Sequence, residues 1–112
     1  MAYGTEDFDS PLSREEISKL WLVNADGGDA RVIVDSIDAI QPSWSPSGER
    51  LAFWSLQAES GQRDLWTVRA DGTDLHRVTD DAALDYCPIW TRDGRWLLFL
   101  SDPGGPKNGW RI

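Results

Sequence analysis

The stretch QPSWSPSGERLAFWS, residues 41–55, places a turn between two aromatic segments. Ser45-Pro46-Ser47-Gly48 suits a tight hairpin, because proline presets φ at the first central position and glycine accepts the left-handed conformation of a bulged loop. The segment RLAFWS that follows is apolar without alternation, which indicates a strand buried on both faces. The stretch therefore predicts two antiparallel strands inside stacked sheets.

The same unit occurs twice in the chain. Residues 87–101, CPIWTRDGRWLLFLS, repeat the proline, tryptophan, glycine, leucine, phenylalanine and serine of the first stretch at an offset of 46. In a second block, KLWLVNADGGD at 19–29 matches DLWTVRADGTD at 64–74 in seven of eleven positions, at an offset of 45. Chance identity is roughly one in fifteen per position. Two blocks in the same order at nearly one period indicate an internal repeat.

Each repeat is predicted to form four short strands. Between residues 41 and 80 these are PSW, RLAFWS, DLWTVRA and LHRVT, with turns at 45–48 and at Asp71-Gly72. A four-stranded unit that recurs about every 45 residues and is buried on both faces is a propeller blade. The predicted fold class is therefore all-β, made of antiparallel β-propeller blades.

Two motifs carry a resemblance to a known family. Pro-x-Trp-Ser-Pro-x-Gly at 42–48 and Leu-Trp-x-Val-x-Ala-Asp-Gly at 65–72 resemble the TolB-type, or WD-like, propeller repeat. The resemblance extends over 1–112 and is best from 41 to 101; it departs at Arg92, where proline is typical, and in segment 6–17. It implies a propeller of six or seven blades. It implies no chemistry, because the repeat occurs in exported Tol-system proteins, in propellers of prolyl-oligopeptidase-like peptidases and in regulators.

The strand order divides the chain into an incomplete blade (1–35), a complete blade (36–80) and a second incomplete blade (81–112). These make about two and a half blades, whereas closure needs at least four and six would need roughly 270 residues at this period. We therefore expect a fragment of a larger propeller. Closure by homo-oligomerisation is disfavoured, because three strands would meet three where a blade holds four.

The composition excludes several classes of partner. The net charge of −8 and the sequence pI of about 4.4 argue against nucleic acid and against an anionic membrane surface. No stretch approaches the roughly 18 apolar residues of a membrane span. Cys87 is the single cysteine, so no disulfide forms within the chain. The acidic N-terminal segment does not resemble a signal peptide, and the compartment stays unassigned.

Candidate chemical groups are few. Asp26 with Asp29, and Asp71 with Asp74, could be calcium ligands, but each turn offers two carboxylates where calcium takes six or more oxygens, so hairpin chemistry is preferred. His76 is the only histidine. It has no serine elbow or cysteine partner, which argues against a catalytic triad and against zinc.

Four other features have a structural and a functional interpretation. Asp85 either points into a central channel or caps the loop that enters a blade, and Cys87 is expected to be a small buried hydrophobe. Ser13-Arg14-Glu15-Glu16 fits a capping box in a recognition insertion, or a solvated loop. Asp80-Asp81 is expected to be a solvated turn.

Equivalent tryptophans are predicted to pack between blades. Trp44 and Trp90 occupy one repeat position, and Trp21 and Trp66 another. We expect these side chains to be largely buried. On that basis Trp44→Ala is predicted to unfold the protein.

These observations predict a non-catalytic propeller scaffold that binds a protein or ligand, with no catalytic, cofactor or metal residues assigned. The expected partner is another protein or the remaining blades of the propeller. The alternative is part of the substrate-gating propeller of a prolyl-oligopeptidase-like serine peptidase whose catalytic domain lies outside this chain. The two differ in whether the full gene encodes an α/β-hydrolase domain with a serine elbow.

Overall fold

A computed structural model describes residues 2–5, 17–57, 60–80, 83–102 and 110–111. Within these ranges every regular element is a strand, and every pairing is antiparallel. The all-β prediction is therefore confirmed, while the predicted capping box at 13–16 and Asp81 lie outside the described residues. The strands are β1 (Ala2–Thr5), β2 (Lys19–Leu22), β3 (Arg31–Val34), β4 (Ile40–Trp44), β5 (Arg50–Leu56), β6 (Arg63–Arg69), β7 (His76–Arg77), β8 (Leu84–Trp90), β9 (Trp96–Asp102) and β10 (Trp110–Arg111).

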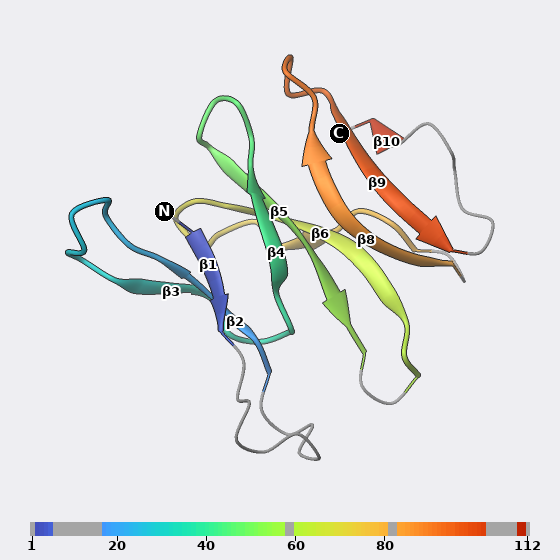
Figure 1. Cartoon of the computed structure of the whole chain (residues 1–112), viewed down its shortest axis with the longest axis horizontal. Coiled ribbons are helices and arrows are strands. Elements are labelled where there is room, and N and C mark those ends of the chain that lie inside the picture. Colours follow the sequence, from blue (N-terminus) through green and yellow to red (C-terminus); the bar gives the residue numbers. More distant parts are fainter. Residues whose placement is uncertain (1, 6–16, 58–59, 81–82, 103–109, 112) are drawn as a thin grey trace.

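The strands form three sheets that follow one another along the chain (Figure 1). The first has the order β1-β2-β3, the second β4-β5-β6-β7, and the third β10-β9-β8. The second sheet contains the four strands that the sequence predicts between residues 41 and 80. Strands β4 and β8 each carry a register shift, one between Ile40 and Ser43 and the other between Tyr86 and Ile89.

Strand β5 explains why its sequence is apolar without alternation. Leu51 and Phe53 are fully buried on one face of the second sheet, and Ala52 is fully buried on the other. Because successive side chains of a strand point to opposite faces, one strand contributes to two separate cores. The first core lies between the first and second sheets, and the second core lies between the second and third.

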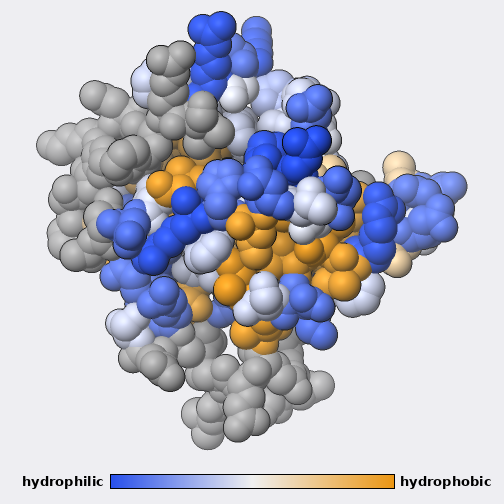
Figure 2. Space-filling model, turned by 180° about the vertical axis from the view of Figure 1, so that it is seen from behind, coloured by the Kyte–Doolittle hydropathy of each residue, from blue (hydrophilic) through white to orange (hydrophobic). Residues whose placement is uncertain are grey.

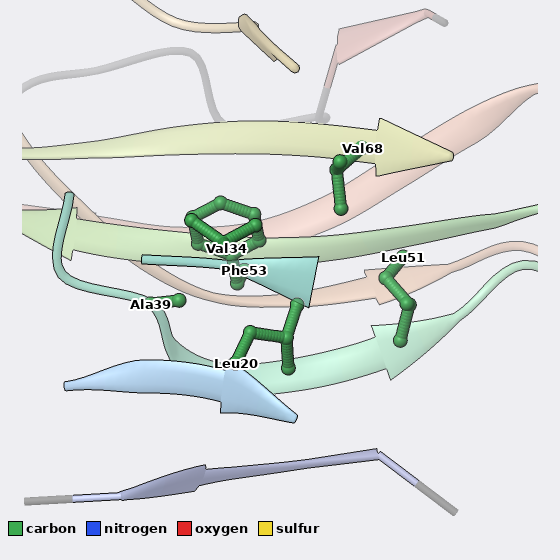
Figure 3. Packing of buried hydrophobic residues seen from close by; sticks show 6 residues of the cluster. All are labelled: Leu20, Val34, Ala39, Leu51, Phe53 and Val68. Carbon is green, nitrogen blue, oxygen red and sulfur yellow. The ribbon is translucent and has the colours of Figure 1, made fainter. Parts of the chain in front are cut away.

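The first core is a cluster of aliphatic side chains around one aromatic ring (Figure 3). Phe53 is enclosed completely, so its truncation to alanine is expected to cost about 3–5 kcal/mol of unfolding free energy. Partly buried residues, among them Ile33, Trp66 and Leu75, pack around the cluster. Its buried members are Leu20, Val34, Ala39, Leu51, Phe53 and Val68.

The second core joins the third sheet to the second. Ala52 and Leu65 of the second sheet meet Trp90 and Leu97 of the third. The Trp90 indole Nε1 also donates a hydrogen bond of 3.0 Å to the carbonyl oxygen of Ser43, in the edge strand β4 of the second sheet. The tryptophan therefore binds two sheets together by its ring and by its polar edge.

The prediction that equivalent tryptophans are largely buried is wrong for Trp44. Trp90 is 8% exposed, whereas Trp44 is 37% exposed. Trp44 lies on β4, which contacts the first sheet at β1, and β1 pairs only with β2 among the strands described. Trp90 bonds Ser43 of β4, the edge strand of the preceding sheet. Among the described residues, the first sheet has no equivalent of β4 that could do the same for Trp44. Trp21 and Trp66 are both half-buried.

The outward face of the third sheet is apolar and open. Ile89 and Leu98 are register partners, and both are more than half exposed, as is Leu100. The alternate residues of β9, Leu97 and Phe99, face the second core. Seen from behind, the molecule also shows hydrophobic residues gathered in its middle between hydrophilic ones (Figure 2).

Candidate functional site

The antiparallel strands give the molecule two ends. The connections β4–β5, β6–β7 and β8–β9 lie at one end, called here the turn end. The connections β3–β4 and β7–β8, which pass from one sheet to the next, lie at the other with the β5–β6 hairpin, and this is the crossover end. In Figure 1 the β4–β5 and β8–β9 turns point to the top and the β5–β6 hairpin to the bottom.

At the turn end, polar groups are satisfied by their own hairpins. Gly48 N donates to Ser45 O at 2.9 Å, and Gly94 N donates to Thr91 O at the same distance. The Thr91 hydroxyl bonds the Asp93 carboxylate at 2.7 Å and lowers the pKa of that carboxyl. These contacts leave few groups for a ligand.

The β6–β7 connection is longer than the predicted two-residue turn. Strand β6 ends at Arg69, and the left-handed residues that follow are Gly72 and Asp74. Asp71 instead accepts hydrogen bonds from the backbone and hydroxyl of Thr73, and the hydroxyl bond lowers the pKa of Asp71. The carboxylate is thus used in shaping the turn. Within the described ranges, no group of three or more histidine, cysteine or acidic side chains could hold a metal ion.

His76 lies between a carboxylate and a hydroxyl, in the order of a catalytic triad. Its Nδ1 is 3.5 Å from Asp74 Oδ1, and its Nε2 is 3.3 Å from Thr67 Oγ1. However, Arg50 Nη2 also faces Nδ1 at 3.3 Å. Arginine only donates, so the Arg50 contact is a hydrogen bond when Nδ1 accepts, whereas the Asp74 contact is one when Nδ1 carries a proton.

Thr67 is fully buried, and its hydroxyl also accepts a 3.2 Å hydrogen bond from Arg50 Nη2, so it is not open to a substrate. Arg50 Nη1 bonds Asp74 Oδ2 at 2.9 Å, and this bond lowers the pKa of the Asp74 carboxyl. The cluster therefore joins β5, β6 and β7 at the turn end. Its geometry does not activate a nucleophile.

At the crossover end, a pocket of about 160 Å³ opens at the junction of the first two sheets. Its polar wall includes Asp38, Ser55 and Asp64, and its apolar wall includes Ile37 and Trp66. Asp38 and Asp64 are both buried. Such a mixture of a few polar groups with apolar walls is typical of a binding pocket.

The buried acids at this end have partners. Asp64 forms an ion pair with Arg77, which also reaches Asp80 at 3.4 Å. Asp85 is fully buried and accepts a 2.6 Å hydrogen bond from the Ser101 hydroxyl, so it ties β8 to β9. This contact lies between two strands of one sheet, so the channel and the loop-cap interpretations of Asp85 both stay predictions.

Two equivalent residues at the crossover end have unusual backbones. Gln41 and Cys87 each precede the repeat proline, and both are left-handed, with φ of 54° and 58°. They fall within the register shifts of β4 and β8, where an extra residue turns its side chain out of the ladder. The Cys87 thiol donates to Gln41 Oε1 at 3.0 Å and is only partly buried, which corrects its prediction as a plain buried hydrophobe.

These residues belong to a group called here the aromatic–arginine cluster: Gln41, Trp54, Arg63, Tyr86 and Cys87. The Arg63 guanidinium carbon is 5.1 Å from the ring centre of Trp54 and 5.6 Å from that of Tyr86. The two rings meet edge to face, with centres 6.5 Å apart. Strands of the second and third sheets thus hold a cation in an aromatic corner.

Sequence reasoning missed this cluster, although one signal was present. The repeat is regular at the turn end, yet position 54 is tryptophan where its equivalent, 100, is leucine, and position 41 is glutamine where 87 is cysteine. Both of these differences between the repeats lie at the crossover end. Positions that vary within a regular repeat are those that packing alone does not determine.

Comparisons with known proteins support the repeat assignment, although no family model matches the sequence. The chain is 40% identical over 47 residues to the Tol-Pal system protein TolB of Anaeromyxobacter dehalogenans, covering 42% of the chain. It is 30% identical over 67 residues to Dipeptidyl-peptidase 5 of Porphyromonas gingivalis, covering 60% of the chain. The chain spans only about a tenth of the length of each of these two relatives.

The solved structure of TolB from Acinetobacter baumannii has the same fold. It superimposes with a TM-score of 0.69 over 93% of this chain and 24% of that protein, at 24% sequence identity. No helix among the described residues is long and apolar enough to cross a membrane. The repeat motifs, the stacked antiparallel sheets and these likenesses agree: the chain has the fold of a TolB-type β-propeller and is similar in sequence to that family over part of its length.

Proposed function

We propose that this chain is a binding module that holds a protein partner at its crossover end and performs no chemistry of its own. The observation that carries the proposal is the aromatic–arginine cluster, in which Arg63 is fixed by two rings from neighbouring sheets. Aromatic side chains and arginine are the residues that dominate protein–protein recognition. The pocket beside Asp38 and Asp64 lies at the same end.

The proposal includes the organisation of the chain. We take residues 1–35, 36–80 and 81–112 as successive blades, of which the middle one has four strands. The open face of the third sheet, with Ile89, Leu98 and Leu100, is apolar enough to take a further blade. The corresponding face of the second sheet supports this, because Ala52 and Leu65 there are covered by the third sheet. The remaining blades are thus a second class of partner.

Matched variants test which end binds. Peptides are selected from a displayed library on the wild-type chain and then measured on Gln57→Trp and Arg92→Trp. Gln57 lines the pocket at the crossover end, whereas Arg92 is exposed at the turn end. We expect at least a tenfold loss of affinity with Gln57→Trp and no change with Arg92→Trp. A loss of affinity in Arg92→Trp alone would place the binding site at the turn end and contradict the proposal.

The absence of catalysis is tested directly. The purified chain is incubated with dipeptidyl p-nitroanilides and with p-nitrophenyl esters, and we expect hydrolysis no faster than in buffer. Hydrolysis that disappears in His76→Ala would contradict the proposal and would make the histidine cluster an active site.

A second function has one observation in its favour. The similarity to Dipeptidyl-peptidase 5 favours a propeller that gates a serine peptidase domain encoded elsewhere in the same gene. In that case the crossover end would meet a peptide substrate or the catalytic domain. Sequencing the flanking gene for an α/β-hydrolase domain with a serine elbow separates the two functions.

A further inference from the structure

We infer that Arg63 recognises a carboxylate, carried by an acidic side chain or by the free C-terminus of the partner. This inference rests on the proposed function and deepens it by naming the chemistry of what is bound. The observations behind it are the geometry of the arginine, the absence of an acid beside it among the described residues, and a second donor from Gln41.

The aromatic corner orients the guanidinium without satisfying its donors. The faces of Trp54 and Tyr86 lie 5.1 and 5.6 Å from the guanidinium carbon and cover the cation by cation–π contact. Ring faces do not take the place of a carboxylate at the rim of a guanidinium, where its N–H groups point. The planar rim is the part of arginine that pairs with a carboxylate in bidentate fashion.

No acidic side chain among the described residues forms an ion pair with Arg63. Asp64, the next residue, points to the opposite side of β6 and pairs with Arg77. Arg50 and Arg77 both form ion pairs, but none involves Arg63. Arg63 is partly exposed, its Nε is buried without a hydrogen-bond partner, and its two Nη groups form no hydrogen bond with the described residues. Among the described residues Arg63 is thus an oriented cation without an ion-pair partner, in a chain with net charge −8.

Gln41 supplies a second donor. Its Oε1 accepts from Trp54 Nε1 at 2.6 Å and from the Cys87 thiol at 3.0 Å. Both partners are donors, so the amide oxygen must face them and the NH₂ group must face away. The bond from Trp54 also holds the indole ring that faces the Arg63 guanidinium. Gln41 is exposed, so its NH₂ group is open to a ligand at the edge of the cluster.

A carboxylate fits this site better than a phosphate group. Both anions accept two hydrogen bonds from one guanidinium. A phosphate monoester carries about −1.5 to −2 charges at neutral pH, whereas a carboxylate carries one. The acidic protein repels the higher charge more strongly, because the summed field of the chain acts on the whole charge of the ligand.

The test follows the Trp54 indole N–H by NMR while ligands are added to the wild-type chain. The probes are Ac-Ala-Ala-Glu-Ala-Ala-NH₂, which has an internal carboxylate, Ac-Ala-Ala-Gln-Ala-Ala-NH₂, which has none, and Ac-Ala-Ala-Ala-Ala-Ala-OH, which has a terminal one. Inorganic phosphate is the fourth probe. We expect a saturable shift with at least one carboxylate peptide and none with the glutamine peptide, and the responding peptide identifies the source.

Variants assign the effect to Arg63. We expect Arg63→Gln to remove the saturable shift, Arg63→Lys to weaken binding about tenfold, and Arg92→Gln to leave it unchanged. Equal shifts with the glutamate and glutamine peptides, tighter binding of phosphate, or full binding by Arg63→Gln would each overturn the inference. If Arg63→Gln does not fold, the comparison of the glutamate and glutamine peptides on the wild-type chain still shows whether binding needs a carboxylate.

The same data separate this inference from the proposed function. If a library-selected peptide binds at the crossover end and keeps its affinity in Arg63→Gln, the module is a binding module and the carboxylate inference is wrong. If no library peptide binds at the crossover end, the proposed function is wrong as well.

Discussion

The two ends of the stacked sheets use their polar residues differently. At the turn end, Ser45, Asp71 and Asp93 each bond a backbone N–H within their own hairpin. At the crossover end, Gln41 and Arg63 contact residues of a different strand, and Arg63 keeps donors without acceptors. These turn-end groups are used within their hairpins, although Arg50 Nε there is also buried without a hydrogen-bond partner. The partly exposed Arg63 is the reason that we propose partner binding at the crossover end.

The contrast between the two ends follows from what each needs of its side chains. The motifs that reveal the fold lie at the turn end because every blade needs the same turn chemistry. A binding site needs one particular combination of side chains, so it lies where the repeats differ. Six variants in four experiments should sharpen this contrast, with effects that decrease from Trp90→Ala to Asp74→Asn.

Trp90→Ala should give the largest effect, because it removes a buried ring from the second core near the turn end. We expect the free energy of unfolding to fall by about 3–5 kcal/mol in urea denaturation. Trp44→Ala, at the equivalent but 37% exposed position, should cost about 1 kcal/mol. Equal losses of unfolding free energy at the two positions would show that burial in the second core does not make Trp90 more important for stability than Trp44.

Gly72→Ala should cost more than Gly48→Ala, and both act at the turn end. Each glycine is left-handed, with φ of 88° and 77°, and an L-residue there costs about 1–2 kcal/mol. A Cβ at position 72 would also lie 3.3 Å from the Ile33 carbonyl oxygen, whereas nothing lies within 4 Å at position 48. Urea denaturation of the two variants checks the order, and a costlier Gly48→Ala would reverse it.

Arg63→Gln, at the crossover end, should separate stability from binding. The cation–π contacts of a partly exposed arginine contribute about 0.5–1 kcal/mol, so the urea midpoint should move little. Carboxylate binding should fall at least tenfold in the NMR titration. A variant that loses several kcal/mol of stability would show that Arg63 belongs to the fold, as the turn-end residues do.

Asp74→Asn should have the smallest effect, limited to acidic pH. The hydrogen bond from Arg50 lowers the pKa of Asp74 below its ordinary value of 3.8. The carboxylate therefore adds stability that is fully present above pH 3.8 and is lost as the pH falls through the lowered value. Urea midpoints at pH 7 and pH 3 should differ less for Asp74→Asn than for the wild type, and an equal difference would remove Asp74 from the acid response.

Much of the fold could be predicted, because turns and strands buried on both faces are determined by short, contiguous stretches of sequence. The apolar run Leu51–Trp54 and the turn at 45–48 both form as expected. The burial of Trp44 could not be predicted from its repeat position, since burial depends on the neighbouring sheet and not on the residue. Asp71 was expected in a two-residue turn, but its bond to Thr73 favours a longer connection.

The candidate site was less accessible to sequence reasoning. Trp54, Arg63 and Tyr86 come from three strands in two sheets, and none lies at a position that the repeat shares. Their meeting depends on how the sheets stack and on the bulges at Gln41 and Cys87, which a single sequence does not reveal. The irregular positions 41 and 54 were the visible signal.

The most direct test of the central claim, that the crossover end is the binding face, is amide hydrogen exchange with and without a library-selected peptide. The account predicts slower exchange on binding in residues 35–41, 60–64 and 83–87, and unchanged exchange in 45–49, 70–75 and 91–95. Slowing confined to the turn-end segments would contradict it.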